Sequence, residues 1–205
     1  MTDDELLSKF KFTELTEEVL AECEHFSCGI DDLDEYFQKD AIGYTQRMVS
    51  RSYVFRPKSN PQQIACAFSV SNDSLRMTDL SNRKQEAFRE ENDLSEKRLK
   101  RYPGILIGRL AVNKAMAHQG IGTALMNFIK RWLGTGGKTG YRFLIVDARN
   151  AQDALAYYEK NGFTYLFASE EEESRSTRKD KAVVPQNTRL MFFDLMDLQP
   201  RKNPA

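Results

Sequence analysis

The stretch ILIGRLAVNKAMAHQGIGTALMNFIKRWLG, residues 105–134, joins an almost continuous apolar run to a glycine loop and then to a helical pattern. The run at 105–112 predicts a central strand that is buried on both faces. After the loop, apolar side chains recur with the spacing of one helix face. Gly120 and Gly122 therefore lie where a strand leads into a helix, a position that suits an anion because the helix N–H groups and dipole face it.

These glycines complete neither of two common nucleotide-binding motifs. A dinucleotide loop of the form G-x-G-x-x-G needs its third glycine at Leu125. The segment GTGGKTG, residues 134–140, contains Gly-Lys-Thr, but a Walker loop needs a glycine at Trp132 and precedes a helix instead of following one. The sequence therefore disfavours both a Rossmann fold and a nucleoside triphosphatase.

The remaining pattern predicts a single domain over residues 1–205, in which a strand, a helix and several antiparallel strands precede the run at 105–112, and in which helices and strands follow it. Expected strands are 10–15, 48–55, 63–71, 143–148, 163–167 and 188–195, and expected helices begin at Asp31 and cover 150–160. Two highly charged segments interrupt this pattern, at about 83–101 and 169–187. We expect the first to be a solvated helix or a mobile excursion. In the second, we expect residues 169–182 to be too polar to bury and to form the long tip of a hairpin.

Composition narrows the function classes. Lys+Arg and Asp+Glu balance at 30 each and the pI is near 6.8, which disfavours a strongly basic surface for non-specific nucleic-acid binding. No apolar run is long enough to cross a bilayer, and the acidic amino end does not look like a secretory signal, so we expect a soluble, cytoplasmic protein without a membrane partner. Cys23, His25 and Cys28 lie close together, but no fourth ligand accompanies them, so we predict no metal site.

Two separated motifs resemble the acyl-coenzyme A signature of the GNAT superfamily of N-acetyltransferases. They are LAVNKAMAHQGIGTALM at 110–126 and FLIVDARNAQDALAYYEKNGF at 143–163. The resemblance implies an α/β fold with a mixed, mostly antiparallel sheet of about six or seven strands, flanked by helices and splayed between its fourth and fifth strands. FSCGIDDLDEYFQKDA at 26–41 and RYPGILIGRLAV at 101–112 are similar to the branch that includes bacterial toxins acetylating aminoacyl-tRNA.

The resemblance also implies acetyl-CoA as co-substrate and assigns residues to it. Backbone groups of Leu110, Ala111 and Val112 would pair with the pantetheine arm as an added strand does. The pyrophosphate would be held by N–H groups of the loop and first helical turn, namely His118, Gln119, Gly120, Ile121, Gly122 and Thr123. Tyr158 matches the family tyrosine near the sulfur, where its phenol would protonate the departing thiolate. The alternative for Tyr158 is a packed aromatic residue on a helix face.

Two positions depart from the family pattern. Ala117 stands where the family has Gln or Arg, so one side-chain contact to phosphate is absent and His118 or Gln119 would have to replace it. The family asparagine would fall on Ala151, and Asn150 lies one place early. We assign Asn150 to the cofactor site, with helix capping as the alternative.

The implied reaction is direct attack of a primary amine on acetyl-CoA, without an acyl-cysteine. The acceptor stays open among aminoacyl-tRNA, a small amine and a protein amine, and Asp147 and Glu159 are candidate bases. A tRNA acceptor needs a basic face, for which the available residues are Arg101, Arg109, Lys130, Arg131, Lys138 and Arg142. Implied partners are a second copy in a homodimer and a small antitoxin. The competing hypothesis is a non-catalytic acyl-CoA-binding or interaction module on the same fold.

Overall fold

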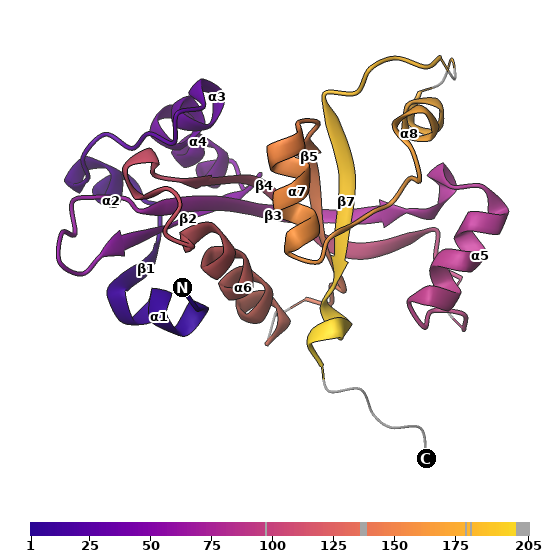
Figure 1. Ribbon diagram of the computed structural model, residues 1–205, viewed down its shortest axis with the longest axis horizontal. Coiled ribbons are helices and arrows are strands. Elements are labelled where there is room, and N and C mark those ends of the chain that lie inside the picture. Colours follow the sequence, from indigo (N-terminus) through magenta and orange to yellow (C-terminus); the bar gives the residue numbers. More distant parts are fainter. Residues whose placement is uncertain (97, 136–138, 179, 181, 200–205) are drawn as a thin grey trace. The chain divides into compact units, whose positions relative to one another are not determined.

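A computed structural model describes residues 1–96, 98–135, 139–178, 180 and 182–199 (Figure 1). Its helices are α1 (Asp3–Lys9), α2 (Glu17–Glu22), α3 (Asp31–Glu35), α4 (Ala41–Gln46), α5 (Asn82–Glu91), α6 (Ile121–Gly134), α7 (Gln152–Lys160) and α8 (Glu170–Thr177). Its strands are β1 (Phe10–Glu14), β2 (Arg51–Pro57), β3 (Cys66–Arg76), β4 (Arg101–Val112), β5 (Phe143–Arg149), β6 (Thr164–Tyr165) and β7 (Thr188–Asp194). The described strands form one mixed seven-stranded sheet in the order β1-β2-β3-β4-β5-β7-β6.

The described residues divide into two compact units, and strands β3 and β4 run through both. The first unit comprises Met1–Ser71 and Ile107–Thr135. The second comprises Asn72–Leu106 and the described residues after Thr135. That the whole chain is one domain stays a prediction.

In the first unit, helices cover both faces of the antiparallel strands β1, β2 and β3 (Figure 1). Side chains alternate between the faces of a strand, so each face has its own partners. One face packs on α6, where the ring of Phe12 lies 4.8 Å from that of Phe128 and 5.3 Å from that of Trp132. The core under α3 and α4 comprises Leu15, Phe26, Tyr36, Phe37, Ala41, Val54, Ile64, Ala67 and Ala111.

In the second unit, β4 and β5 are parallel, while β7 is antiparallel to both β5 and β6. The parallel register begins at Gly104 opposite Phe143. A Cβ at Gly104 would stand 2.9 Å from the Phe143 carbonyl oxygen, so this close pairing needs glycine. The mixed, mostly antiparallel sheet is confirmed, and its parallel pair is formed by the fourth and fifth strands, where the resemblance implies a splay.

The first charged segment, 83–101, begins with helix α5, which confirms one of its two expected forms. Phe88 anchors this helix, because its ring is buried 5.6 Å from that of Phe143 and 5.4 Å from that of Phe192. A single aromatic residue thus attaches an otherwise charged helix to the core of the second unit.

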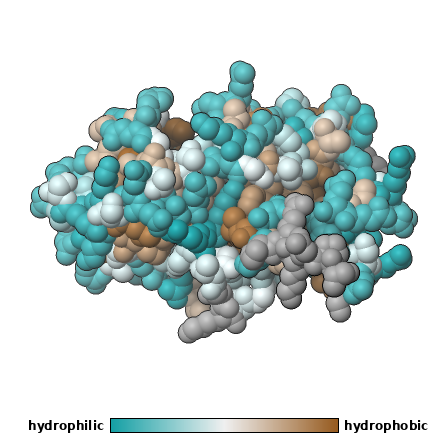
Figure 2. All heavy atoms as spheres, turned by 60° about the horizontal axis from the view of Figure 1, so that its bottom comes forward, coloured by the Kyte–Doolittle hydropathy of each residue, from teal (hydrophilic) through white to brown (hydrophobic). Residues whose placement is uncertain are grey.

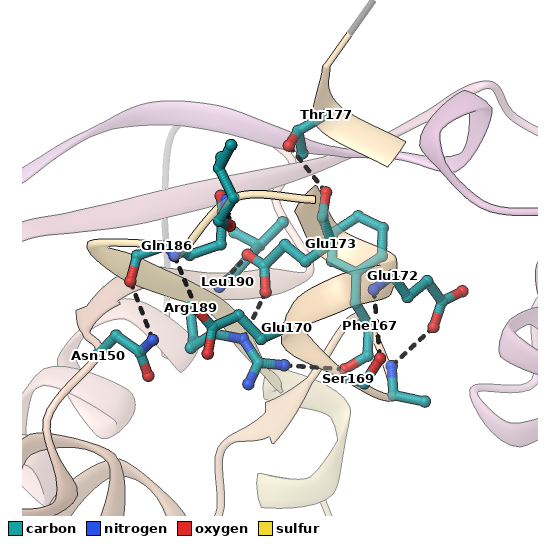
Figure 3. A network of polar contacts seen from close by, with 12 residues as sticks. Asn150, Phe167, Ser169, Glu170, Glu172, Glu173, Thr177, Gln186, Arg189 and Leu190 are labelled. Carbon is teal, nitrogen blue, oxygen red and sulfur yellow. Dashed lines mark hydrogen bonds and ion pairs between the residues drawn. The ribbon is translucent and has the colours of Figure 1, made fainter. Parts of the chain in front are cut away.

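The prediction that residues 169–182 are too polar to bury is wrong for two of them, Glu173 and Ser174. This segment forms α8, in which Glu173 and Ser174 are buried. The carboxylate of Glu173 pairs with Arg189 at 2.6 Å and accepts the Leu190 N–H at 2.7 Å (Figure 3). Acids in this segment accept backbone N–H groups from distant residues, and those hydrogen bonds compensate for burial.

Three further elements differ from the expected pattern. Helices α1 and α2 were not anticipated, although a capping box formed by Thr2 and Glu5 begins α1. The strand expected at 163–167 pairs only at Thr164–Tyr165, as β6. Phe163 and Phe167 on either side of it are buried, so their apolar character reflects core packing beyond the strand.

The surface is mainly hydrophilic on the face drawn in Figure 2, where apolar side chains gather in small groups. Among the described residues, no helix combines the length and apolarity needed to cross a membrane.

Candidate active site

The carboxyl end of β4 is fixed by Asn113, a residue to which the sequence motifs assign no role. Its N–H donates to the Ala65 carbonyl at 2.8 Å, and its Nδ2 donates to the Ile64 carbonyl at 2.9 Å. Its Oδ1 accepts the Ala115 N–H at 3.0 Å, which begins the turn that follows. Its position directly after an apolar strand could have indicated this role, since asparagine favours helix caps and turns.

The segment containing FSCG supports the same turn from the amino-terminal side. The Lys114 N–H donates to the Ser27 carbonyl at 2.9 Å. Asp34 holds this segment in place, because its carboxylate accepts the Ser27 hydroxyl and the Cys28 N–H, each at 2.7 Å. Burial raises the pKa of Asp34, but these hydrogen bonds outweigh it and leave the pKa below its ordinary value. No described cluster of three or more His, Cys, Asp or Glu residues could hold a metal ion.

The loop between β4 and α6 has two residues in the left-handed conformation. They are His118, with φ of 61°, and Gly120, with φ of 77°. Glycine adopts this conformation without strain, whereas histidine adopts it at a cost. Backbone curvature of this kind directs successive N–H groups toward one side, and the amino end of α6 adds its positive dipole. The loop therefore has the backbone geometry expected for a phosphate site.

Side chains of the loop are available to a ligand. Residues 117–120 are all exposed. Ala117 brings no hydrogen-bonding group to this surface, whereas His118 and Gln119 do. Ile121 is buried and anchors the start of α6, while Gly122 and Thr123 are partly exposed. In β4, Ala111 is buried in the core under α3 and α4, and Leu110 and Val112 are partly exposed.

Tyr158 lies on α7 in the second unit. Its ring is 5.2 Å from that of Tyr157 and 5.5 Å from that of Phe163. Burial raises the pKa of Tyr158 to about 12. Its hydroxyl makes no hydrogen bond to any residue within the described parts of the chain. A neutral phenol without an internal partner is available to donate a proton.

Asn150 is engaged in contacts within the second unit. Its Nδ2 donates to the Gln186 carbonyl at 2.9 Å (Figure 3). Its N–H donates to the Asn187 carbonyl at 2.9 Å. The N-cap of α7 is Ala151, without a side-chain hydrogen bond. Asn150 therefore does not cap this helix but links the end of β5 to the segment before β7. A contact between Asn150 and the cofactor stays a prediction.

The two candidate bases have distinct surroundings. Burial, followed by the negative charges of Asp73 and Glu173, raises the pKa of Asp147. Glu159 accepts a hydrogen bond from the side chain of Tyr165. A raised pKa moves a carboxylate toward the range useful for a general base, which suits Asp147 to that role.

Several of the basic residues considered for a tRNA surface are engaged elsewhere. Arg142 donates to both carboxylate oxygens of the buried Asp194, and Arg131 pairs with Asp3 and Asp4. Lys130 is buried. Lys138 lies outside the described residues. These contacts, and the burial of Lys130, make Arg142, Arg131 and Lys130 poorly suited to such a surface.

The family comparison matches residues 87–165 to the acetyltransferase (GNAT) domain. Among solved structures, a tyrosine-to-phenylalanine variant of KacT is 17% identical with a TM-score of 0.67, over 93% of this chain and 98% of that one. AtaT complexed with acetyl-methionyl-tRNAfMet is 18% identical with a TM-score of 0.67, over 93% and 97%. A variant of the toxin AtaT bound to acetyl-CoA and to the C-terminus of the antitoxin AtaR is 16% identical with a TM-score of 0.61, over 93% and 97%.

The matched segment contains β4, the glycine loop, α6 and α7, which are the elements that carry both sequence motifs. The fold is shared with the solved KacT and AtaT structures over almost the full length of each chain. Residues 87–165 therefore match the acetyltransferase (GNAT) domain, and the chain shares its fold with these solved structures.

Proposed function

We propose that the protein transfers the acetyl group of acetyl-CoA to a primary amine by direct attack. The observation that carries this proposal is the loop between β4 and α6, where Gly120 and His118 take the left-handed conformation in front of a helix. N–H groups of residues 118–123 would bind the pyrophosphate, and backbone groups of 110–112 would pair with the pantetheine arm.

In the proposed reaction the amine nitrogen attacks the thioester carbonyl carbon, and the carbon–sulfur bond breaks. A backbone N–H of β4 would polarise the carbonyl oxygen. Tyr158 would donate its proton to the departing thiolate, and its raised pKa keeps it protonated at neutral pH. The attacking amine must be neutral, so either a base such as Asp147 takes its proton or the amine has a low pKa of its own.

We propose aminoacyl-tRNA as the acceptor, with small amines and protein amines as the competing classes. An aminoacyl ester lowers the pKa of its own amine, so it needs no strong enzyme base. AtaT, which shares the fold, has been solved with acetyl-methionyl-tRNAfMet. Turnover of acetyl-CoA against a panel of amines that includes charged tRNA tests this choice. Acetylation of a small amine or a protein amino terminus, with charged tRNA left unmodified, would refute it.

Assembly and location belong to the same proposal. AtaT binds the C-terminus of its antitoxin AtaR, and we propose a small antitoxin partner for this chain by analogy. We also propose a homodimer in the cytoplasm. Size-exclusion chromatography with light scattering measures the oligomeric state, and a monomer at micromolar concentration would contradict the dimer.

Absence of a basic or amide side chain at Ala117 favours a second candidate, a non-catalytic acyl-CoA-binding module. The two candidates make different predictions for titration calorimetry and turnover. The enzyme binds acetyl-CoA and consumes it with an acceptor, whereas the module binds it without turnover. No detectable binding of CoA would contradict both.

Gly120→Ala is expected to weaken acetyl-CoA binding. Alanine in a left-handed conformation costs about 1–2 kcal/mol, and its Cβ would stand 3.0 Å from the backbone nitrogen of Met1. Gly29→Ala is the matched control, because Gly29 has φ of 84° but has no atom within 4 Å of the added Cβ. Both variants should melt earlier, but only Gly120→Ala should bind acetyl-CoA more weakly in calorimetry. Equal affinities in the two variants would count against the loop as the phosphate site.

Neither Cys28 nor Cys66 is expected to carry the acetyl group. Burial and then the nearby Asp34 raise the pKa of the Cys28 thiol to about 11, and complete burial raises the pKa of Cys66. Thiolates, not thiols, are the nucleophiles, so neither residue is activated. Intact-mass analysis after incubation with acetyl-CoA alone should show unmodified protein. An acetylated cysteine that disappears when acceptor is added would replace direct attack with a two-step mechanism.

A further inference from the structure

Arg109 lies on β4 immediately before Leu110, where the strand segment assigned to the pantetheine arm begins. Strands rise about 3.3 Å per residue, so its Cα lies within about 10 Å of that of Val112 along the strand. Side chains alternate along a strand, so Arg109 shares a face with Ala111. Ala111 packs in the core under α3 and α4, and Arg109 therefore lies on the side of β4 that faces these helices.

Two contacts hold the guanidinium of Arg109 in place. Its Cζ lies 5.2 Å from the centroid of the Tyr36 ring, a cation–π distance, and its Nη1 donates to the Gly108 carbonyl at 2.9 Å. Nε is buried and has no hydrogen-bond partner among the described residues. Retaining an unpaired buried donor is unfavourable for folding, so its presence points to a use other than stability.

The charge of Arg109 is poorly neutralised by the protein. Its nearest acid is Asp32, with 3.9 Å between Nε and Oδ2, and the Asp32 side chain is 82% exposed. Exposed pairs of this kind are weak because water and salt screen them. The Arg109 side chain is itself 40% exposed, whereas the cations Arg131 and Arg142 have closer carboxylates.

An exposed aromatic ring accompanies this cation. Tyr44 is 43% exposed, and its ring lies 5.5 Å from that of Tyr36, on which Arg109 rests. Exposed aromatic rings stack on nucleobases, and arginine binds phosphate through its fork of donors. Arg109, Tyr36 and Tyr44 therefore combine the two groups that recognise a nucleotide, next to the proposed acetyl-transfer strand.

We infer that Arg109 is a specificity-determining residue that binds a phosphate of an aminoacyl-nucleotide acceptor, with Tyr44 as the stacking surface for a base. This inference rests on the proposed function and narrows it, since it names the phosphate of the acceptor as the group that Arg109 recognises. Asp32 competes with the phosphate for the same guanidinium.

The test compares two acceptors that differ by one phosphate. One is the aminoacylated dinucleotide CpA, and the other is 3′-aminoacyl-adenosine. Arg109→Gln should raise KM for the dinucleotide about 10- to 100-fold, as expected when a charge-assisted hydrogen bond is lost. KM for the adenosine ester, kcat for both acceptors and the Kd of acetyl-CoA should change little. Arg109→Lys should recover part of the loss, because it keeps the charge without the fork.

Controls separate phosphate binding from a structural role. Arg51→Gln removes an exposed arginine that pairs with Glu14, and it should leave KM for both acceptors unchanged. Asp32→Asn should act in the opposite direction to Arg109→Gln and lower KM for the dinucleotide, because it removes the competing carboxylate. An equal loss for both acceptors in Arg109→Gln, or no loss for either, would overturn the inference.

A binding measurement tests the phosphate site independently of turnover. Uncharged CpA is titrated into wild-type protein and Arg109→Gln at two salt concentrations, with thermal melts to confirm that both are folded. We expect about 10-fold weaker binding in the variant, and a smaller salt dependence. Wild-type binding that depends on Arg109 without any acetyl transfer would contradict the proposed function and uphold the phosphate site. Equal binding of CpA by the two proteins would refute the proposed phosphate site, whatever the result of the turnover experiment.

Discussion

Tyr158→Phe is expected to lower kcat for acetyl transfer by about 10²- to 10⁴-fold, the usual contribution of a positioned general acid. The substitution removes the phenolic hydroxyl and keeps the ring that packs against Tyr157 and Phe163. Acetyl-CoA affinity and thermal stability should therefore be close to those of the wild type. Steady-state kinetics with calorimetry separates these quantities.

Tyr157→Phe is the matched control for this experiment. It removes the same group from the adjacent residue of α7, and it should retain kcat within a few-fold. Full turnover by Tyr158→Phe would show that the thiolate leaves without this proton donor. Loss of acetyl-CoA binding in Tyr158→Phe would instead show that the tyrosine serves in binding.

The pH dependence of kcat provides a further check on Tyr158. Its pKa is raised to about 12, so the phenol stays protonated as pH rises through 10, where an unperturbed tyrosine would ionise. We expect no fall in kcat from ionisation of Tyr158 below about pH 10. A basic limb with an apparent pKa near 10 or lower that disappears in Tyr158→Phe would contradict this expectation. The profile should be measured at saturating acceptor.

Glu173→Ala is expected to destabilise the protein by about 3–5 kcal/mol, because it leaves a buried arginine without its partner. The side chains of Glu173 and Arg189 are 7% and 11% exposed, and Arg189 also lies over the Tyr165 ring. The same substitution removes the acceptor of the Leu190 N–H. Urea unfolding monitored by circular dichroism measures the change in the free energy of unfolding.

Two comparisons identify the origin of that loss. Glu171 forms an exposed pair with Arg175 on the same helix, so Glu171→Ala should cost less than about 1 kcal/mol. A Glu173→Leu, Arg189→Met double variant should be more stable than Glu173→Ala, because it leaves no uncompensated charge. If Glu173→Ala costs as little as Glu171→Ala, the ion pair does not hold α8 in place.

Periodicity was sufficient to predict β4, β5 and α6, since each buries a continuous apolar surface of its own. The helix α8 could not be predicted in this way, because its burial depends on Glu173 meeting Arg189 and the Leu190 N–H in a later strand. Local patterns carry no information about such distant partners. The same applies to α5, where Phe88, the one buried residue of the helix, provides the attachment.

The candidate site was predictable to the extent that it is local in sequence. The strand end, the glycine loop and the start of α6 are contiguous, so their order alone indicated a phosphate site. The roles of Asn113 and Arg109 could not be predicted in full, because they depend on contacts with residues distant in sequence. Asn113 contacts Ile64, and Arg109 contacts Tyr36. The position of Asn150 in the motif predicted a cofactor contact, whereas its side-chain amide donates a hydrogen bond to the Gln186 carbonyl in the structure.

The most direct test of acetyl transfer is incubation of the purified protein with acetyl-CoA and a mixed amine panel containing charged tRNA, followed by mass analysis of the acceptors and of free CoA. We predict that one acceptor gains an acetyl group, with release of one CoA per product, and that Tyr158→Phe slows both together. Binding of acetyl-CoA without any acetylated acceptor, or acetylation at an unchanged rate in Tyr158→Phe, would contradict the mechanism proposed for this fold.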